Sequence, residues 1–381
     1  MKISALRVVL SVAFLAVLSG FWLFAQNQSR PLATSSGINV AEALGGGDTE
    51  GYARALEPRP FVFPNDHGPH PEFRNEWWYF TGNLQTADGR PFGYQFTLFR
   101  NSLAPEISDA TQSAWKTNQL YMGHFAVSDL AAERFYFAER FQRAAVGLAG
   151  AQAKPIRVWL DDWEIREVGG DDQTLCWEVN AETEEFAVTF TVQEQKPHVL
   201  QGDRGLSQKG RQEGNASYYY SYTRLQAEGT VRTPAGTFAV SGTSWLDREW
   251  STSALEDNQE GWDWFALQLR DNTEIMYYQL RRTDGSPDDT SKGVFVNQQG
   301  QKRDLRYQNV TLSVTKTWTS PHTGATYPSG WELSIPEEQI SLQITPRLRD
   351  QELRTAVAYW EGSVHIEGTH AGQAVDGLGY V

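Results

Sequence analysis

The feature that most constrains the fold is a series of short, aromatic-rich segments separated by turn-forming residues. In residues 94–98 and 262–269 apolar and polar side chains alternate, which is the pattern of a half-buried β-strand. Residues 87–90 (Ala-Asp-Gly-Arg) and 233–236 (Thr-Pro-Ala-Gly) are typical of hairpin turns. Short strands joined by hairpins favour an antiparallel meander, and closing a meander into a barrel removes its exposed edges. The expected strands are residues 77–85, 92–99, 120–127, 135–139, 157–164, 174–179, 186–193 and 217–224.

The composition agrees with an all-β structure. Aromatic residues make up 13% of the chain, with 14 Trp and 15 Tyr, and strands favour aromatic side chains. Aromatic residues also line apolar cavities, so the same composition fits a site for a lipophilic ligand. The formal net charge of −14 provides no basic surface for nucleic acid, so we expect no nucleic-acid partner.

The N-terminus has the pattern of an export signal. Lys2 and Arg7 precede an almost unbroken apolar run from residue 8 to residue 25. This pattern predicts a signal peptide or a retained membrane anchor over residues 1–25, and the basic residues before the run place the rest of the chain outside the cytoplasm. We therefore expect a periplasmic or secreted protein, held at the inner membrane if the segment is uncleaved. Residues 26–60 are rich in Gly, Ala and Ser and are expected to be a flexible linker.

An internal repeat indicates two related halves. Residues 77–84 align with residues 262–269, and after one gap residues 94–96 align with residues 278–280. Each copy opens a comparable run of strands, which favours two barrels in tandem, although a chance match between two aromatic hairpins is the alternative. The expected domains are residues 61–251 and 252–381.

Three tracts of the chain carry a recognisable pattern. They are residues 66–82, which contain Glu-Trp-Trp-Tyr; residues 217–250, which contain Tyr-Tyr-Tyr and end in Trp-Leu-Asp-Arg-Glu-Trp; and residues 261–269. Together they resemble the AttH-like, lipocalin-like family, to which carotenoid 1,2-hydratase (hydroxyneurosporene synthase) also belongs. The resemblance covers about residue 60 to the C-terminus. It implies an all-β fold of two tandem lipocalin-like antiparallel β-barrels after the N-terminal segment, export, and a role beside ABC transporter subunits.

The hydratase branch of this family raises the question of a catalytic acid. Hydration of an isolated C=C bond needs an acid whose pKa is raised by apolar surroundings, and aromatic faces that stabilise the cation formed. Asp263 lies between Trp262 and Trp264. If both tryptophans face one side of the strand, Asp263 faces the other side, where it would instead point at solvent or pair with a cation.

Two further carboxyl groups are candidates for the same role. Asp247 and Glu249 share one face of an extended segment and are suited to acid–base chemistry or to a structural ion pair. Glu76 precedes a Trp pair, and it is either an acid at the barrel mouth or the partner that neutralises Arg248 or Arg224. A Trp packed by an Arg at a closed barrel end is the structural alternative for these tracts. The candidate catalytic residues are therefore Asp263, Asp247 and Glu76.

Aromatic residues in the same tracts are the candidate ligand contacts. His124 lies in a strand-like segment and points either into a cavity or into a core. The tyrosines of residues 218–222 either offer hydroxyl groups to a cavity or place aromatic rings on both faces of a sheet. His67 and His70 lie in a Pro- and Gly-rich stretch that we expect to be a solvated loop, and we expect no metal or cofactor. The candidate ligand-binding residues are Trp77, Trp78, Tyr79, His124, Tyr218, Tyr220, Trp245, Trp262 and Trp264.

These observations predict an exported protein whose barrels enclose an apolar hollow for a lipophilic or isoprenoid-type ligand, with ABC transporter subunits as partners. The alternative is a hydro-lyase that resembles carotenoid 1,2-hydratase. A third possibility is a module that docks a transporter without holding a ligand. The chain contains no Gly-x-Ser-x-Gly elbow that would support hydrolysis.

Overall fold

The computed structural model describes residues 49–105, 113–169, 174–253, 255–256 and 258–381. The expected signal or anchor segment, and the expected linker up to residue 48, lie outside the described residues. Within the described part of the chain, no helix is long and apolar enough to cross a membrane. The regular structure there is β-strand, apart from the short 3-10 helices η1 (Asn65–His67), η2 (Tyr307–Asn309) and η3 (Pro336–Glu338).

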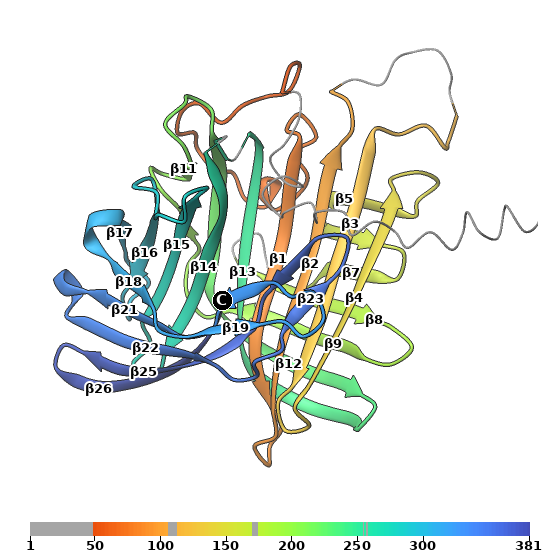
Figure 1. Cartoon of the computed structure of the whole chain (residues 1–381). Coiled ribbons are helices and arrows are strands. Elements are labelled where there is room, and N and C mark those ends of the chain that lie inside the picture. Colours follow the sequence, from red (N-terminus) through yellow and green to blue (C-terminus); the bar gives the residue numbers. More distant parts are fainter. Residues whose placement is uncertain (1–48, 106–112, 170–173, 254, 257) are drawn as a thin grey trace, which may run out of the picture. The chain divides into compact units, whose positions relative to one another are not determined.

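The first sheet is antiparallel and contains 13 strands in a nearly closed barrel (Figure 1). Its order is β4-β3-β2-β1-β13-β12-β9-β8-β7-β6-β5, and β10 and β11 pair with β12. The strands are β1 (Asn75–Gln85), β2 (Pro91–Ser102), β3 (Gln119–Asp129), β4 (Arg134–Arg143), β5 (Ala149–Ala153), β6 (Ile156–Leu160), β7 (Trp163–Gly169), β8 (Cys176–Glu182), β9 (Ala187–Glu194), β10 (Val199–Leu200), β11 (Leu206–Gln208), β12 (Ala216–Thr233) and β13 (Gly236–Ser253).

The second sheet has nine strands and forms a half-barrel, in the order β17-β16-β15-β14-β26-β25-β22-β21-β18. The all-β, lipocalin-like fold expected from the sequence is thus confirmed. The strands are β14 (Gln259–Leu269), β15 (Glu274–Arg282), β16 (Lys292–Val296), β17 (Lys302–Arg306), β18 (Thr311–Val314), β21 (Trp331–Ile335), β22 (Ile340–Pro346), β25 (Ser363–His370) and β26 (Gln373–Tyr380), and the two-stranded pairs are β19 (Thr317–Thr319) with β20 (Thr326–Pro328) and β23 (Glu352–Arg354) with β24 (Ala358–Trp360).

Turn residues explain where several of the strands end. The predicted turn at residues 87–90 joins β1 to β2 and contains Gly89 at φ +88°, a conformation that glycine adopts without a side-chain clash. The predicted turn at residues 233–236 joins β12 to β13. The single strand predicted over residues 157–164 is wrong, because a turn at Asp161 (φ +55°) divides it into β6 and β7. Asp tolerates this left-handed conformation better than most residues, so Asp161 was a turn signal, but the apolar residues around it suggested an uninterrupted strand.

The interior of the first sheet is filled by side chains. Trp78, Phe96, Phe125 and Trp163 belong to one continuous apolar cluster with residues from β6 to β9, which lie at the other end of the strand order. These side chains occupy the interior of the first sheet, where the hollow was expected. A separate cluster from β14 to β26 forms the core of the second sheet.

The turn that precedes β1 is part of this core and not the solvated loop expected from the sequence. His67 and His70 are both buried. The Nδ1 atom of His67 lies 2.6 Å from the Tyr220 hydroxyl, and the ring of His70 stacks on Trp250 at 3.8 Å. Burial is the main cause that lowers the pKa of His67 to about 3. The Pro and Gly content of this stretch indicated a loop but not its burial.

Buried polar contacts connect the two sheets. Lys196, which follows β9, donates a 2.8 Å hydrogen bond to Glu274 of β15, and Arg224 of β12 donates one of 2.5 Å to the same carboxylate. Near the C-terminus, Asn83 of β1 donates to the Gly379 carbonyl of β26 at 3.1 Å. Such satisfied buried bonds favour one arrangement of the sheets over others.

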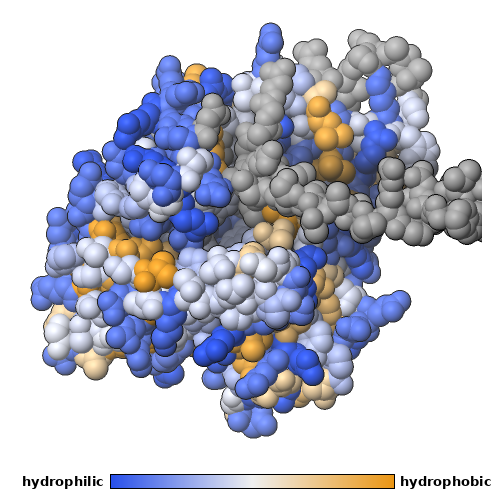
Figure 2. All heavy atoms as spheres, viewed as in Figure 1, coloured by the Kyte–Doolittle hydropathy of each residue, from blue (hydrophilic) through white to orange (hydrophobic). Residues whose placement is uncertain are grey.

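On the face shown in Figure 2, hydrophilic residues cover most of the surface and hydrophobic residues form separate patches. The exposed large apolar side chains of the described residues include Leu103, Trp115 and Phe141. Scattered exposed side chains of this kind are normal for a globular protein.

Candidate functional site

A cavity of about 330 Å³ lies between the outer face of the first sheet and the second sheet. Strands β1, β2, β3 and β13 form one wall, and β14, β15 and residues 357–361 form the other. A second, more open depression of about 700 Å³ lies over β18, β21, β22, β25 and β26, where mainly Ser, Thr, Glu and Gln line it. The aromatic residues that line the first cavity are Trp77, Tyr79, Phe99, Tyr219, Trp262, Trp264, Tyr278, Tyr327, Trp331, Tyr359 and Trp360.

Strand register brings the residues of the first wall together. Tyr79 of β1 pairs with Thr97 on one side and with Asp247 on the other, and Thr97 in turn pairs with His124. Side chains of directly paired residues point to the same face of a sheet, so these four residues form one row across the wall. The opposite side chains of these strands, such as Trp78, enter the core described above.

Asp247 is a buried acid within this row, with 3% of its surface exposed. Its carboxylate accepts hydrogen bonds from Tyr219 and Ser221, both at 2.5 Å, and from the Trp245 indole at 2.7 Å. Burial outweighs these hydrogen bonds and raises the pKa of Asp247 to about 6. Asp247 therefore exchanges a proton near neutral pH.

Glu361 is a second buried acid on the opposite wall, with 8% of its surface exposed. The Tyr79 hydroxyl donates a hydrogen bond to its Oε1 atom. Burial raises the pKa of Glu361 to about 8, although the bond from Tyr79 opposes this shift. Tyr79 thus connects the two walls, since it pairs across the strands with Asp247 and bonds to Glu361.

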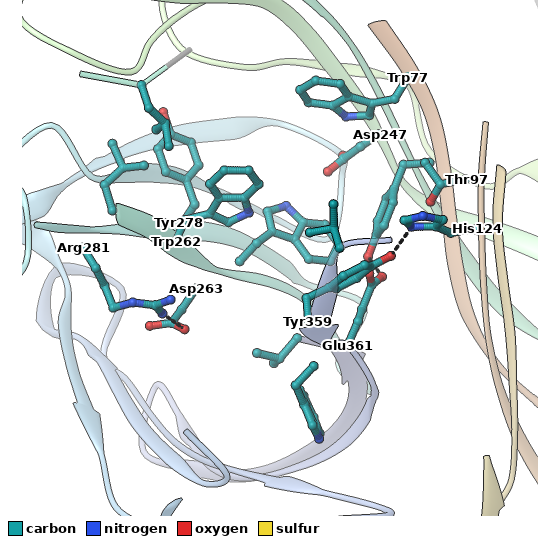
Figure 3. A pocket seen from close by; sticks show the side chains of 18 of the residues that line it. Trp77, Thr97, His124, Asp247, Trp262, Asp263, Tyr278, Arg281, Tyr359 and Glu361 are labelled. Atoms are coloured by element: carbon teal, nitrogen blue, oxygen red, sulfur yellow. Dashed lines mark hydrogen bonds and ion pairs between the residues drawn. The ribbon is translucent and has the colours of Figure 1, made fainter. Parts of the chain in front are cut away.

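His124 occupies the edge of the cavity next to Glu361. Its Nδ1 atom lies 2.7 Å from the Tyr359 hydroxyl, and its Nε2 atom lies 3.0 Å from Glu139. In Figure 3, His124, Tyr359 and Glu361 lie on one side of the cavity, and Asp263 and Arg281 lie on the other. The imidazole therefore joins a partly exposed carboxylate to a phenol that lines the cavity.

Four further charged residues of the cavity wall form two ion pairs. Lys209 lies 2.9 Å from Glu249, and its ammonium group lies over the Tyr278 ring at 4.3 Å. Asp263 forms an ion pair with Arg281, as one of the two interpretations of its sequence context anticipated. Within each pair, the positive charge of the cation offsets the negative charge of its carboxylate.

Glu76 lies on the core side and not in the cavity wall. It is fully buried and forms ion pairs with Arg100 and Arg248. These two guanidinium groups hold the pKa of Glu76 well below its usual range although burial opposes them. Arg248 also lies over the Trp78 ring at 3.9 Å. Glu76 is thus placed as a partner that neutralises Arg248, which is one of the two interpretations of its sequence context.

The structure separates the candidate ligand-binding residues by strand face. Tyr218 and Tyr220 face the core, whereas Tyr219, which was not singled out, lines the cavity. Trp245 does not line the cavity, but its indole N–H donates a hydrogen bond to the Asp247 carboxylate and so positions it. Strand alternation within the Tyr run could have separated Tyr219 from its neighbours, whereas no sequence signal marked Glu361 or Tyr359. The candidates that line the cavity are Trp77, Tyr79, His124, Trp262, Trp264, Asp247 and Asp263, and those that lie elsewhere are Trp78, Tyr218, Tyr220, Trp245 and Glu76.

The cavity is suited to an apolar ligand and to proton transfer. Its walls present aromatic ring faces, and burial raises the pKa values of its two acids, which form no ion pair with a Lys, Arg or His of the described residues. Among the described residues, no group of three or more His, Cys, Asp or Glu side chains is arranged to hold a metal ion.

Comparisons with known proteins agree with this architecture. A family profile described as AttH-like matches residues 54–381. The crystal structure of a protein from Nitrosomonas europaea described as an AttH has a TM-score of 0.74 and 34% identity, and the match covers 86% of this chain and 98% of that one. The structure of kievitone hydratase from Nectria haematococca has a TM-score of 0.64 and 15% identity, over 86% of this chain and 96% of that one, which shows a shared fold. A comparison with curated protein sequences found no match.

Proposed function

This chain belongs to the AttH-like family, and on that premise we propose that it binds a lipophilic or isoprenoid-type ligand in the cavity between its two sheets. The observation that carries this proposal is the cavity wall itself, which is made largely of aromatic side chains with a few convergent polar groups. Ligand sites in proteins typically combine these two features. The cavity volume of about 330 Å³ suits a small ligand or one end of a long isoprenoid chain.

Ligand binding is tested with the purified full-length chain and a panel of lipids and isoprenoids. We expect a bound compound to quench tryptophan fluorescence and to raise the melting temperature. Trp262→Ala removes one aromatic side chain from the cavity wall and should weaken binding by about tenfold or more, since a buried aromatic contact of this size is worth over 1 kcal/mol. Trp159→Ala, in the first sheet and away from the cavity, is the matched control. No quenching and no thermal shift with any compound would refute the proposal.

A hydro-lyase is the second candidate, because Asp247 and Glu361 are acids whose pKa values burial raises, to about 6 and to about 8. In this reaction a carboxylic acid donates its proton to one carbon of a C=C bond, and the aromatic rings stabilise the cation on the other carbon. Water then adds to the cation, and its surplus proton returns to the carboxylate. Kievitone hydratase shares the fold with this chain, although the low identity transfers no residue roles.

The hydro-lyase is tested by incubation with acyclic carotenoids and other prenyl compounds, followed by mass spectrometry for the gain of one water. Activity should disappear in Glu361→Gln or in Asp247→Asn, whichever residue is the acid, and should persist in the control Glu164→Gln. If compounds bind but no hydrated product forms, the hydro-lyase is refuted and ligand binding is the function that remains. Product that is undiminished in both variants would exclude these two acids.

Export and transport association complete the proposal. The basic residues and apolar run of the N-terminus support a periplasmic or secreted location, with an inner-membrane anchor if the segment is retained. A ligand-binding protein at this location could exchange its ligand with ABC transporter subunits. Cross-linking in cell envelopes should yield a transporter adduct, and recovery of uncross-linked protein alone would count against that partner.

A further inference from the structure

The residues that line the cavity include more acids than cations, and a neutral ligand would not explain this excess. The two cations that line it, Lys209 and Arg281, are each paired with a carboxylate of their own. Asp247 and Glu361 form no ion pair with a Lys, Arg or His of the described residues, and both are more than nine-tenths buried. Two buried acids of the cavity wall are therefore left without an ion-pair partner of their own among the described residues.

The surroundings of these acids are dipolar and aromatic. Glu361 faces the hydroxyl groups of Tyr79, Tyr359 and Tyr380. Asp247 faces Tyr219, Ser221 and Trp245, with the carboxylate of Glu249 also near it and Lys209 beyond that carboxylate. Lys209 is a positive charge near Asp247, but its ion pair is with Glu249, and the carboxylate of Glu249 disfavours a second negative charge on Asp247.

Aromatic faces beside unpaired carboxylates are the chemical requirements for binding an organic cation. A ring face attracts a cation through its quadrupole, most strongly for tryptophan and when the site is dry. The stretches that repeat in the sequence supply these faces from both walls, since Trp77 and Tyr79 come from β1 and Trp262 and Trp264 come from β14. The edge of the Tyr79 ring already contacts Trp264, with ring centres 5.1 Å apart.

We propose that the ligand of this cavity is a lipophilic amine or quaternary ammonium compound, whose cationic head lies where Asp247, Tyr79 and Glu361 meet. This inference rests on the proposed ligand-binding function and names the chemical class of its ligand. The apolar part of the ligand lies along the tryptophans, and the head supplies the counter-charge that the two acids lack.

The test compares three probes with the same eight-carbon chain: octyltrimethylammonium, 1-octanol and octyl sulfate. Binding to the purified full-length chain is measured by calorimetry or tryptophan fluorescence. We expect octyltrimethylammonium to bind about tenfold or more tightly than 1-octanol, and octyl sulfate to bind most weakly. Glu361→Gln and Asp247→Asn should each remove much of the preference for the cation, while the control Glu228→Gln on the exposed face of β12 should retain it.

The pH dependence provides a second readout. Glu361 must lose a proton to receive a cation, so affinity for octyltrimethylammonium should rise by roughly tenfold or more from pH 6 to pH 8, with a proton released to the buffer. Affinity for 1-octanol should not rise over this range.

The outcomes separate this inference from the function on which it rests. Equal affinity for octyltrimethylammonium and 1-octanol would overturn the inference and leave lipophilic binding in place. Failure of all three probes, together with failure of the lipid and isoprenoid panel, would overturn both. A preference for the cation that survives in both carboxyl variants would also overturn the inference, because the acids would not be its source.

Discussion

Individual acids in this chain differ because their surroundings differ. Glu76 and Glu361 are both buried glutamates, but Glu76 forms ion pairs with two arginines, whereas Glu361 accepts a hydrogen bond from the Tyr79 hydroxyl and forms no ion pair among the described residues. The pKa of Glu76 is therefore lowered and that of Glu361 is raised. One glutamate stabilises the core as an anion, and the other remains available to hold a proton or to meet a ligand.

Removing the charge of Glu76 should destabilise the fold. Glu76→Gln leaves Arg100 and Arg248 as buried cations without a carboxylate, and the free energy of unfolding should fall by about 3–5 kcal/mol. Urea unfolding measures this loss, with the exposed Glu72→Gln in the same loop as control. A variant as stable as the parent would show that these ion pairs do not stabilise the core.

Glu361 should make stability depend on pH in the opposite sense to a paired carboxylate. In the folded protein it keeps its proton up to about pH 8, while in the unfolded chain it loses it near its ordinary pKa of 4.5. The folded state therefore binds more protons between these values, and the free energy of unfolding falls as pH rises through this range. Urea unfolding at pH 5 and pH 8 should show a smaller decline in Glu361→Gln than in the parent. Equal declines would contradict the burial of an unpaired acid.

At the scale of the element, strand alternation decides which residues can reach the ligand. On β12, Tyr218, Tyr220 and Tyr222 enter the core while Tyr219 enters the cavity wall. On β13, Asp247 and Glu249 face the cavity while Arg248 faces the core. A shift of one residue in the pairing would exchange these two sets, so the register of β12 and β13 determines the chemistry of the site.

Two neighbouring tyrosines should respond differently to the same substitution. Tyr219→Phe removes a hydrogen bond that lowers the pKa of Asp247, so this pKa should rise above about 6 in a carboxyl NMR titration. Tyr220→Phe removes the contact with His67 and should cost about 1 kcal/mol of stability without changing the Asp247 titration. A reversed pattern would mean that the β12 register is different.

At the scale of the whole molecule, the cavity depends on how the two sheets are held together. Its walls come from both sheets, and each sheet has its own apolar core. The buried cluster of Lys196, Arg224 and Glu274 connects them. The site is thus a property of the paired sheets and not of either barrel alone.

Disrupting this connection should lower the stability of the whole structure. Glu274→Gln leaves Lys196 and Arg224 as buried cations, and the midpoint of urea unfolding should fall by an amount equivalent to about 3–5 kcal/mol. Glu332→Gln, on an exposed position of β21, should leave the midpoint unchanged. If both variants unfold at the parent's midpoint, the cluster does not hold the sheets together.

The sequence by itself determined the all-β class, most of the strands, the two predicted hairpin turns and the family, because these depend on local periodicity, turn residues and short motifs. It also brought Trp262 and Trp264 into consideration through their aromatic tract, and Asp247 because it shares a strand face with Glu249. Only the tertiary structure decided that the first barrel is packed and that the cavity lies between the sheets. It alone brought Glu361 beside Tyr79, 282 positions away in the chain. The physical reason is that burial and pairing, which set the pKa of a carboxyl group, come from residues distant in the chain that local patterns do not place.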